Sequence, residues 1–216
     1  MRAFAAVWPP EEVLDHLDLA LASVRASVPS SALRWSARET RHLTAAFYGE
    51  LPDGALPALS SELAGRLSER APFELALHGA GLFAHRTLWV GVGGDVAAQR
   101  DVSGACAAAG EAVGAWHDDR PRDRPHLTVG RVRPGSRPPR RRGSPAGATS
   151  PSGRRGSEVD DEVAAALVRA LSVYEGPAWL VDEVLLVESQ PGAGRGGGPL
   201  YRPVERIPLT GPSRAS

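Results

Sequence analysis

Two copies of one tripeptide carry the residue types that acid–base chemistry needs. His42-Leu43-Thr44 in the first half of the chain recurs as His126-Leu127-Thr128 in the second half, and each copy runs into an apolar stretch. In a β-strand, successive side chains point to opposite faces. Each copy therefore predicts a His and a Thr on one face of a strand, with the Leu buried behind them.

Two imidazoles and two hydroxyls around one anion suit the cleavage of a phosphodiester. In-line attack requires that one proton leaves the nucleophile and that another reaches the leaving oxygen. Imidazole titrates near neutral pH, so His42 and His126 can share these two tasks, each transfer contributing about 10²–10⁴-fold. The hydroxyls of Thr44 and Thr128 can donate hydrogen bonds to the non-bridging oxygens. The scheme requires no metal ion and no other cofactor.

The residues that follow each motif bear on how a phosphate would fit. Ala46 and Gly130 stand two places after the threonines, and strict alternation predicts that they share the face of the His and Thr and leave room there. The same alternation places Arg131 on the face opposite to His126. A direct role for Arg131 at the phosphate therefore needs a twist or a bulge in the strand.

The composition limits the classes of protein and mechanism. The chain has 216 residues and no net charge, enough for one sizeable domain and without a global field that attracts nucleic acid. Every basic residue is arginine, which excludes a Walker A loop, a lysine Schiff base and a lysine–nucleotide intermediate. Cys106 is the only cysteine, so an intrachain disulfide and a cysteine-rich zinc site are excluded, and we expect it to be buried.

No targeting or membrane segment is expected. The chain has no apolar run of the length that a transmembrane helix needs, about 18 residues or more. The apolar stretch at its start is interrupted by Pro9-Pro10 too soon for a signal peptide, and it predicts a first strand instead. We therefore expect a cytoplasmic protein with no membrane contact.

Hydrophobic spacing predicts strands and helices in both halves of the chain. Strands are expected over residues 3–8, 33–35, 40–48, 73–77, 87–92, 126–132, 179–187 and 201–209. Helices are expected over residues 11–27, 56–70, 96–116 and 159–173. The Gly-rich stretch Gly192–Gly198 superficially resembles a phosphate-cradling loop, but it does not lead from a strand into a helix. We therefore interpret it as a hairpin loop.

One stretch does not have the composition of a packed element. Residues 134–157 are rich in Arg, Pro, Gly and Ser and have almost no apolar residues, so they bury too little surface to offset the entropy of ordering. They predict a disordered insertion in a single domain that spans residues 1–212. Their positive charge suits an RNA-contacting loop, and a solvated insertion without a role is the alternative.

Four stretches of the chain resemble the two-histidine (2H) phosphoesterase superfamily. Within it, the chain is similar to the RNA 2',3'-cyclic phosphodiesterases, historically called 2'-5' RNA ligases. The stretches are Met1–Val7, Arg34-Trp35 with Arg41–Glu50, Arg124–Arg131, and the tail from Val184 to Leu209.

The resemblance implies an α+β fold that is bilobal and pseudo-symmetric. Two antiparallel sheets would face each other across a central cleft, with helices outside. It implies that His42 and His126 are catalytic and that Thr44, Thr128 and Arg131 bind phosphate. Some of the nearby aromatic residues could stack a base, although packing in the core is the more common use of such side chains. These aromatic residues are Trp35, Phe47, Tyr48 and Tyr201.

The implied activity is hydrolysis of a terminal 2',3'-cyclic phosphate of RNA to a 2'-phosphate, without a metal ion. Two alternatives remain open at this point. One keeps the site but acts on other 2'-linked or cyclic nucleotides, or joins RNA through a 2'-5' linkage. The other is a non-catalytic module that binds RNA ends. In each case RNA ends or cyclic nucleotides are the expected partners, and the protein is expected to be a monomer.

Overall fold

The computed structural model describes residues 1–26, 33–52, 54–84, 86–115, 124–132 and 165–212. The strands are β1 (Arg2–Val7), β2 (Leu33–Trp35), β3 (Leu43–Glu50), β4 (Phe73–Phe83), β5 (Thr87–Gly94), β6 (His126–Val132), β7 (Glu175–Val181), β8 (Glu183–Gln190) and β9 (Leu200–Pro208). The helices are α1 (Glu11–Ala26), α2 (Ala55–Leu67) and α3 (Val96–Ala112), with 3₁₀ turns η1 (Arg38–Thr40) and η2 (Arg195–Gly197). Residues 165–171 are also helical. The insertion predicted at residues 134–157 lies outside the described residues.

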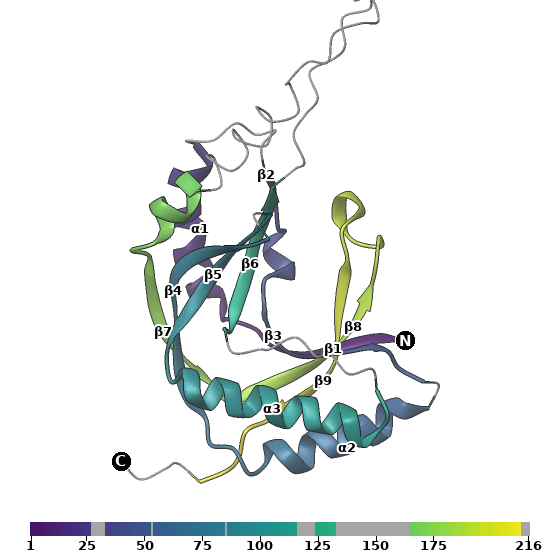
Figure 1. Cartoon of the computed structure of the whole chain (residues 1–216). Coiled ribbons are helices and arrows are strands. Elements are labelled where there is room, and N and C mark those ends of the chain that lie inside the picture. Colours follow the sequence, from purple (N-terminus) through teal and green to yellow (C-terminus); the bar gives the residue numbers. More distant parts are fainter. Residues whose placement is uncertain (27–32, 53, 85, 116–123, 133–164, 213–216) are drawn as a thin grey trace, which may run out of the picture.

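The strands form one antiparallel sheet. Their order is β7-β4-β5-β6-β3-β1-β8-β9. β2 lies off this order and pairs with residues 130–132 at the end of β6. Asp182 alone separates β7 from β8 in the chain, although these strands lie near opposite ends of the sheet. The sheet must therefore curl strongly, as Figure 1 shows. The prediction of an α+β fold is confirmed.

The prediction of two separate sheets is wrong. The half formed by β7, β4, β5 and β6 is continuous with the half formed by β3, β1, β8 and β9. They join through a single registered pair, Leu43 opposite Leu127. These two residues are the centres of the repeated tripeptides, so the two motif strands themselves close the sheet. Alternation along each strand predicts which face is buried, but it does not reveal that these two strands are neighbours.

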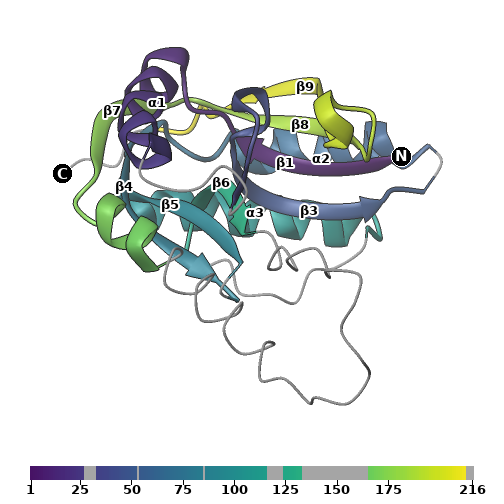
Figure 2. The same ribbon diagram turned by 90° about the horizontal axis from the view of Figure 1, so that it is seen from above.

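Helices cover the convex side of the sheet. Leu59, Leu63 and Leu67 recur every four residues, so they form one buried face of α2. Asp95 caps the N-terminus of α3, because its side chain accepts a hydrogen bond from the amide of Ala98. α2 and α3 pack together beneath the half that contains β3 and β9, whereas α1 packs on β7 (Figures 1 and 2). No membrane-spanning candidate was found among the helices in the described part of the chain.

β1 is buried on both faces and separates two apolar clusters. Ala3 and Ala5 face the main core, which the helices cover. Phe4 and Ala6 face a second, smaller cluster, in which the partly buried side chains are Trp8, Phe47 and Tyr201. This second cluster lies on the concave side of the sheet. It forms an aromatic floor beside the first of the two histidines.

Three of the predicted strands differ most from the observed bounds. β4 continues to Phe83, because a bulge near Gly79, with φ of 61°, lets the strand pass the glycines that predicted its end. The strand predicted over residues 179–187 is two strands, separated at Asp182. The strand predicted from residue 40 begins at Leu43, because residues 38–40 form η1.

Candidate active site

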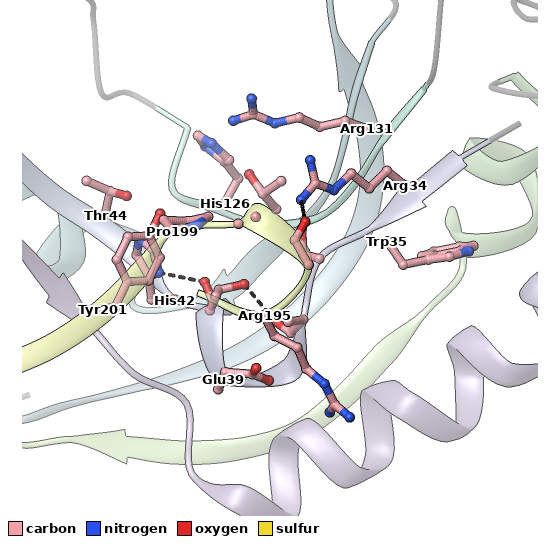
Figure 3. A pocket seen from close by; sticks show the side chains of 17 residues that line it. Arg34, Trp35, Glu39, His42, Thr44, His126, Arg131, Arg195, Pro199 and Tyr201 are labelled. Carbon is pink, nitrogen blue, oxygen red and sulfur yellow. Dashed lines mark hydrogen bonds between the residues drawn. The ribbon is translucent and has the colours of Figure 1, made fainter. Parts of the chain in front are cut away.

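The pairing of β3 with β6 brings the two tripeptides together. In an antiparallel pair with Leu43 opposite Leu127, residue 42 runs beside residue 128 and residue 44 beside residue 126. Both leucines are fully buried, so the flanking side chains point to the other face, which is concave. His42, Thr44, His126 and Thr128 accordingly line one cleft of about 540 Å³. Figure 3 shows both imidazoles in this cleft.

A β-bulge follows the threonine in each copy. In β6, Thr128 lies opposite Trp89 and Gly130 opposite Leu88, so Val129 is the extra residue. In β3, Thr44 lies opposite Ala6 and Ala46 lies opposite Ala5, so Ala45 is the extra residue. A bulge interrupts the alternation of side chains. Each strand therefore changes which residues face the cleft immediately after its motif.

Because of these bulges, the predicted positions of Ala46 and Gly130 are wrong. The bulge in β6 is also the irregularity that a role for Arg131 at the phosphate required. Ala46 and Gly130 do not share the face of the motif side chains: Ala46 is buried in the core, and a Cβ at Gly130 would meet the buried Leu33 side chain at 2.8 Å. Arg131, in contrast, turns into the cleft and lines it. By the same shift Phe47, five residues after His42, faces a smaller adjoining cavity of about 270 Å³.

Both imidazoles are held in the same way. Nδ1 of His42 lies 2.8 Å from the carbonyl oxygen of Thr40, and Nδ1 of His126 lies 2.9 Å from that of Arg124. A carbonyl oxygen only accepts, so each Nδ1 carries the hydrogen and donates it. This fixes the tautomer and makes Nε2 the nitrogen that can exchange protons with a substrate.

Aromatic rings surround each histidine. The His42 ring is stacked on Phe4 at 4.8 Å and meets Tyr201 edge-on at 5.2 Å, between ring centroids. The His126 ring meets Phe83 edge-on at 4.6 Å and lies 6.0 Å from Trp89. Such contacts restrict both rings to the orientation that their carbonyl partners favour. Rigid placement of both groups is what acid–base catalysis at one atom needs.

The electrostatics of the cleft keep His42 neutral when the cleft is empty. Burial in the aromatic cluster lowers the pKa of His42 to about 4, although the Thr40 carbonyl opposes the shift. The charge of His126 lowers this pKa further, so the two imidazoles lie near enough to interact. At pH 7 His42 is therefore an imidazole that can accept a proton.

An ion-pair cluster behind the cleft positions the residues before His42. Arg41 is only 2 % exposed, and its guanidinium donates to Asp18 of α1 at 2.8 Å. Arg38 donates to the same carboxylate at 2.7 Å and also reaches Glu11. These contacts anchor η1 to α1. η1 ends at Thr40, whose carbonyl oxygen orients the His42 ring.

The loop that closes one side of the cleft was not predicted to belong to the site. Arg195 and the glycines around it form η2 between β8 and β9, as a hairpin loop, and they line the cleft with Pro199. Arg34 Nη2 donates to the carbonyl oxygen of Gly196 at 3.2 Å and ties the loop to β2 (Figure 3). The glycine-rich composition of this loop was the sequence signal that could have indicated its place in the cleft.

The predicted aromatic residues divide between the cleft and the core. Tyr201 and Trp35 line the cleft, although the Trp35 ring also packs against the main core. Tyr48 is buried and donates to the carbonyl oxygen of Cys106 at 3.1 Å, so it serves packing. Cys106 is fully buried, as expected.

Comparison with known proteins finds similarity to one family over the first half of the chain. Residues 7–89 match the model of the LigT like Phosphoesterase family. An RNA 2',3'-cyclic phosphodiesterase of Geobacillus stearothermophilus is 36% identical over 111 residues, 48% of this chain and 34% of that protein. Over these residues the chain is similar to LigT-like phosphoesterases. A protein of the same name from Methanothermobacter thermautotrophicus is 30% identical over 43% of this chain and 51% of that protein. The matches thus span about a third and about half of these LigT-like relatives.

Solved structures share the fold over almost the whole chain. A Thermus thermophilus protein superposes with a TM-score of 0.65 at 24% identity, covering 98% of this chain and 99% of that one. Escherichia coli LigT in its apo form gives a TM-score of 0.65 at 21% identity, covering 97% of each chain. E. coli LigT has also been solved in complex with 3'-AMP, with a TM-score of 0.63 at 21% identity over 97% of each chain.

Proposed function

We propose that this protein hydrolyses a 2',3'-cyclic phosphate at an RNA end to a 2'-phosphate. The observation that carries the proposal is the matched pair of imidazoles in one cleft, each with Nδ1 on a backbone carbonyl and a threonine beside it. The name of the two LigT-like relatives, RNA 2',3'-cyclic phosphodiesterase, supports the same activity.

The proposed reaction uses both Nε2 atoms on one phosphorus. A water oxygen attacks the phosphorus opposite the 3'-oxygen, so that a phosphorus–oxygen bond to water forms as the bond to the 3'-oxygen breaks. One imidazole takes the proton of the water, and the other gives its proton to the departing 3'-oxygen. His42 and His126 fill these two roles.

The hydroxyls and the arginine stabilise the charge of the transition state. Thr44 and Thr128 flank the histidines on the same face and are placed to donate to the two non-bridging oxygens. Arg131, turned into the cleft by the bulge at Val129, adds a positive charge to the same cleft.

The test is turnover of 2',3'-cyclic AMP in the presence of EDTA. We expect 2'-AMP, separated from 3'-AMP by chromatography, and a fall in kcat of about 10²-fold or more in His42→Ala and in His126→Ala. His16→Ala is the matched control, because His16 is exposed on α1 and forms its hydrogen bond with Tyr174 outside the cleft. Undiminished turnover in either cleft variant contradicts the proposal.

A 2'-5' linked dinucleotide is the second candidate substrate. The smaller cavity, which Arg2 and Phe47 line, shares His42, Thr44 and Tyr201 with the main cleft. Space on both sides of His42 suits a diester with a nucleoside on each side. Comparing the turnover of a 2'-5' linked dinucleotide with that of 2',3'-cyclic AMP decides between the two substrates.

A further inference from the structure

We infer that Arg34 and Arg131 form a subsite for a second phosphate, on the 5' side of the nucleotide whose cyclic phosphate reacts. The inference rests on the proposed function and names its substrate class. The preferred substrate is an oligonucleotide end, or a nucleotide with a 5'-phosphate. A nucleoside cyclic phosphate without that group is the poorer substrate.

The sheet places these two arginines directly opposite each other. β2 pairs with β6 in the register Leu33–Val132, Arg34–Arg131 and Trp35–Gly130. Residues directly opposite in an antiparallel pair have Cβ atoms about 4.5–5.5 Å apart on the same face. The bulge at Val129 has already turned that face of β6 toward the cleft. Figure 3 shows both guanidinium groups extending from these strands at the end of the cleft where His126 lies.

This arrangement is unfavourable until an anion binds. Like charges directly opposite in a sheet destabilise the pair. In the part of the chain that the structure describes, neither guanidinium has a carboxylate partner, and Glu39 is the one described acidic residue that lines the cleft. Arg34 is held in place by its hydrogen bond to the Gly196 carbonyl. The cleft thus maintains two adjacent cations, which a phosphate can bridge with charge-assisted hydrogen bonds.

One reacting phosphate does not account for both cations. A cyclic phosphodiester carries a single negative charge, and it lies among two imidazoles and two hydroxyls. Thr128 and Arg131 are three positions apart on β6, so their Cα atoms are separated by about 10 Å at about 3.3 Å per residue. The arginine pair therefore extends beyond the reacting phosphorus. Arg34 is the residue that this subsite adds to those predicted from the motifs.

The first test compares two products that differ only in the second phosphate. Isothermal titration calorimetry measures the affinity of adenosine 2',5'-bisphosphate and of adenosine 2'-monophosphate. We expect the wild-type protein to bind the bisphosphate about tenfold more tightly or better, and Arg34→Ala to lose most of this ratio. Arg169→Ala is the control for net charge, because Arg169 is exposed on the helical segment at residues 165–171, outside the cleft, and it should keep the ratio.

The second test applies the same ratio to catalysis. The ratio of kcat/KM for 5'-phosphorylated adenosine 2',3'-cyclic phosphate to that for the unphosphorylated compound should fall about tenfold in Arg34→Ala. Equal binding of the two products by the wild-type protein overturns the inference. So does an Arg34→Ala variant that loses affinity for both products equally, because that is the signature of a loosened Gly196 loop. Absence of turnover with a retained binding ratio counts against the proposed function only.

Discussion

Replacing Asp18 by Asn should cost more stability than replacing any of its exposed neighbours. The Asp18 carboxylate accepts from the guanidinium groups of Arg38 and Arg41, and Arg25 lies 3.9 Å away. Arg41 is 2 % exposed, and its Nε has no hydrogen-bond partner among the described residues. Removing one partner of a buried ion pair leaves an uncompensated charge and costs about 3–5 kcal/mol. We therefore expect the free energy of unfolding to fall by about 3 kcal/mol or more in Asp18→Asn.

The assay is urea unfolding at pH 7, with Asp15→Asn as the matched control. Asp15 also pairs with Arg38, at 2.8 Å, but its side chain is 72 % exposed. Exposed ion pairs contribute about 0–1 kcal/mol, so the control should lose no more than that. A loss below about 1 kcal/mol in Asp18→Asn, or equal losses in the two variants, would refute the reasoning that Asp18 neutralises the buried Arg41.

The ion pairs of Asp18 with Arg38 and Arg41 should make the free energy of unfolding depend on pH. Burial alone would raise the pKa of Asp18, but hydrogen bonds from Arg41 and Arg38 more than offset this, and the pKa lies below its ordinary value. The folded state therefore binds fewer protons than the unfolded state just above that pKa. The stabilisation is complete above the unfolded pKa of about 3.9 and is lost as the pH falls through the folded pKa. The gap in stability between wild type and Asp18→Asn should close over that range.

Three further predictions concern the cleft and the buried core. NMR titration of the free protein should give His42 a pKa near 4, and inorganic phosphate should raise it, whereas a pKa at or above the ordinary value of about 6.5 would contradict the burial described above. Thr44→Val and Thr128→Val should each lower kcat for 2',3'-cyclic AMP by about 10²-fold with little change in thermal stability, and an unchanged kcat would remove that hydroxyl from the scheme. Tyr48→Phe, which loses the hydrogen bond to the Cys106 carbonyl, should lower the free energy of unfolding by about 1 kcal/mol in urea and leave kcat unaltered.

The motif residues could be predicted from the sequence because their signal is local. A repeated His-x-Thr specifies two side chains on one face of a strand, whatever the strand pairs with. The helices were predicted for a similar reason, since leucines every three or four residues define a buried stripe. The structure places His42, Thr44, His126 and Thr128 in one cleft, as that reasoning required.

The surroundings of the motifs could not be predicted because they depend on pairing. A bulge is a difference in residue count between two neighbouring strands, so a single strand does not reveal it. This is why Ala46 and Gly130 were assigned to the wrong face, and why the cleft position of Arg131 became clear only from its register with β5. Likewise the pairing of Arg34 with Arg131 joins segments that lie far apart in the chain.

The central claim is that two imidazoles from distant segments act on one phosphorus atom. The most direct measurement is a crystal structure of the protein with 2'-AMP bound. We predict one phosphate with oxygens within hydrogen-bond distance, about 3 Å, of Nε2 of both His42 and His126, and with the Thr44 and Thr128 hydroxyls on its other oxygens. A phosphate that contacts only one of the imidazoles, or that binds outside the cleft, would contradict the account.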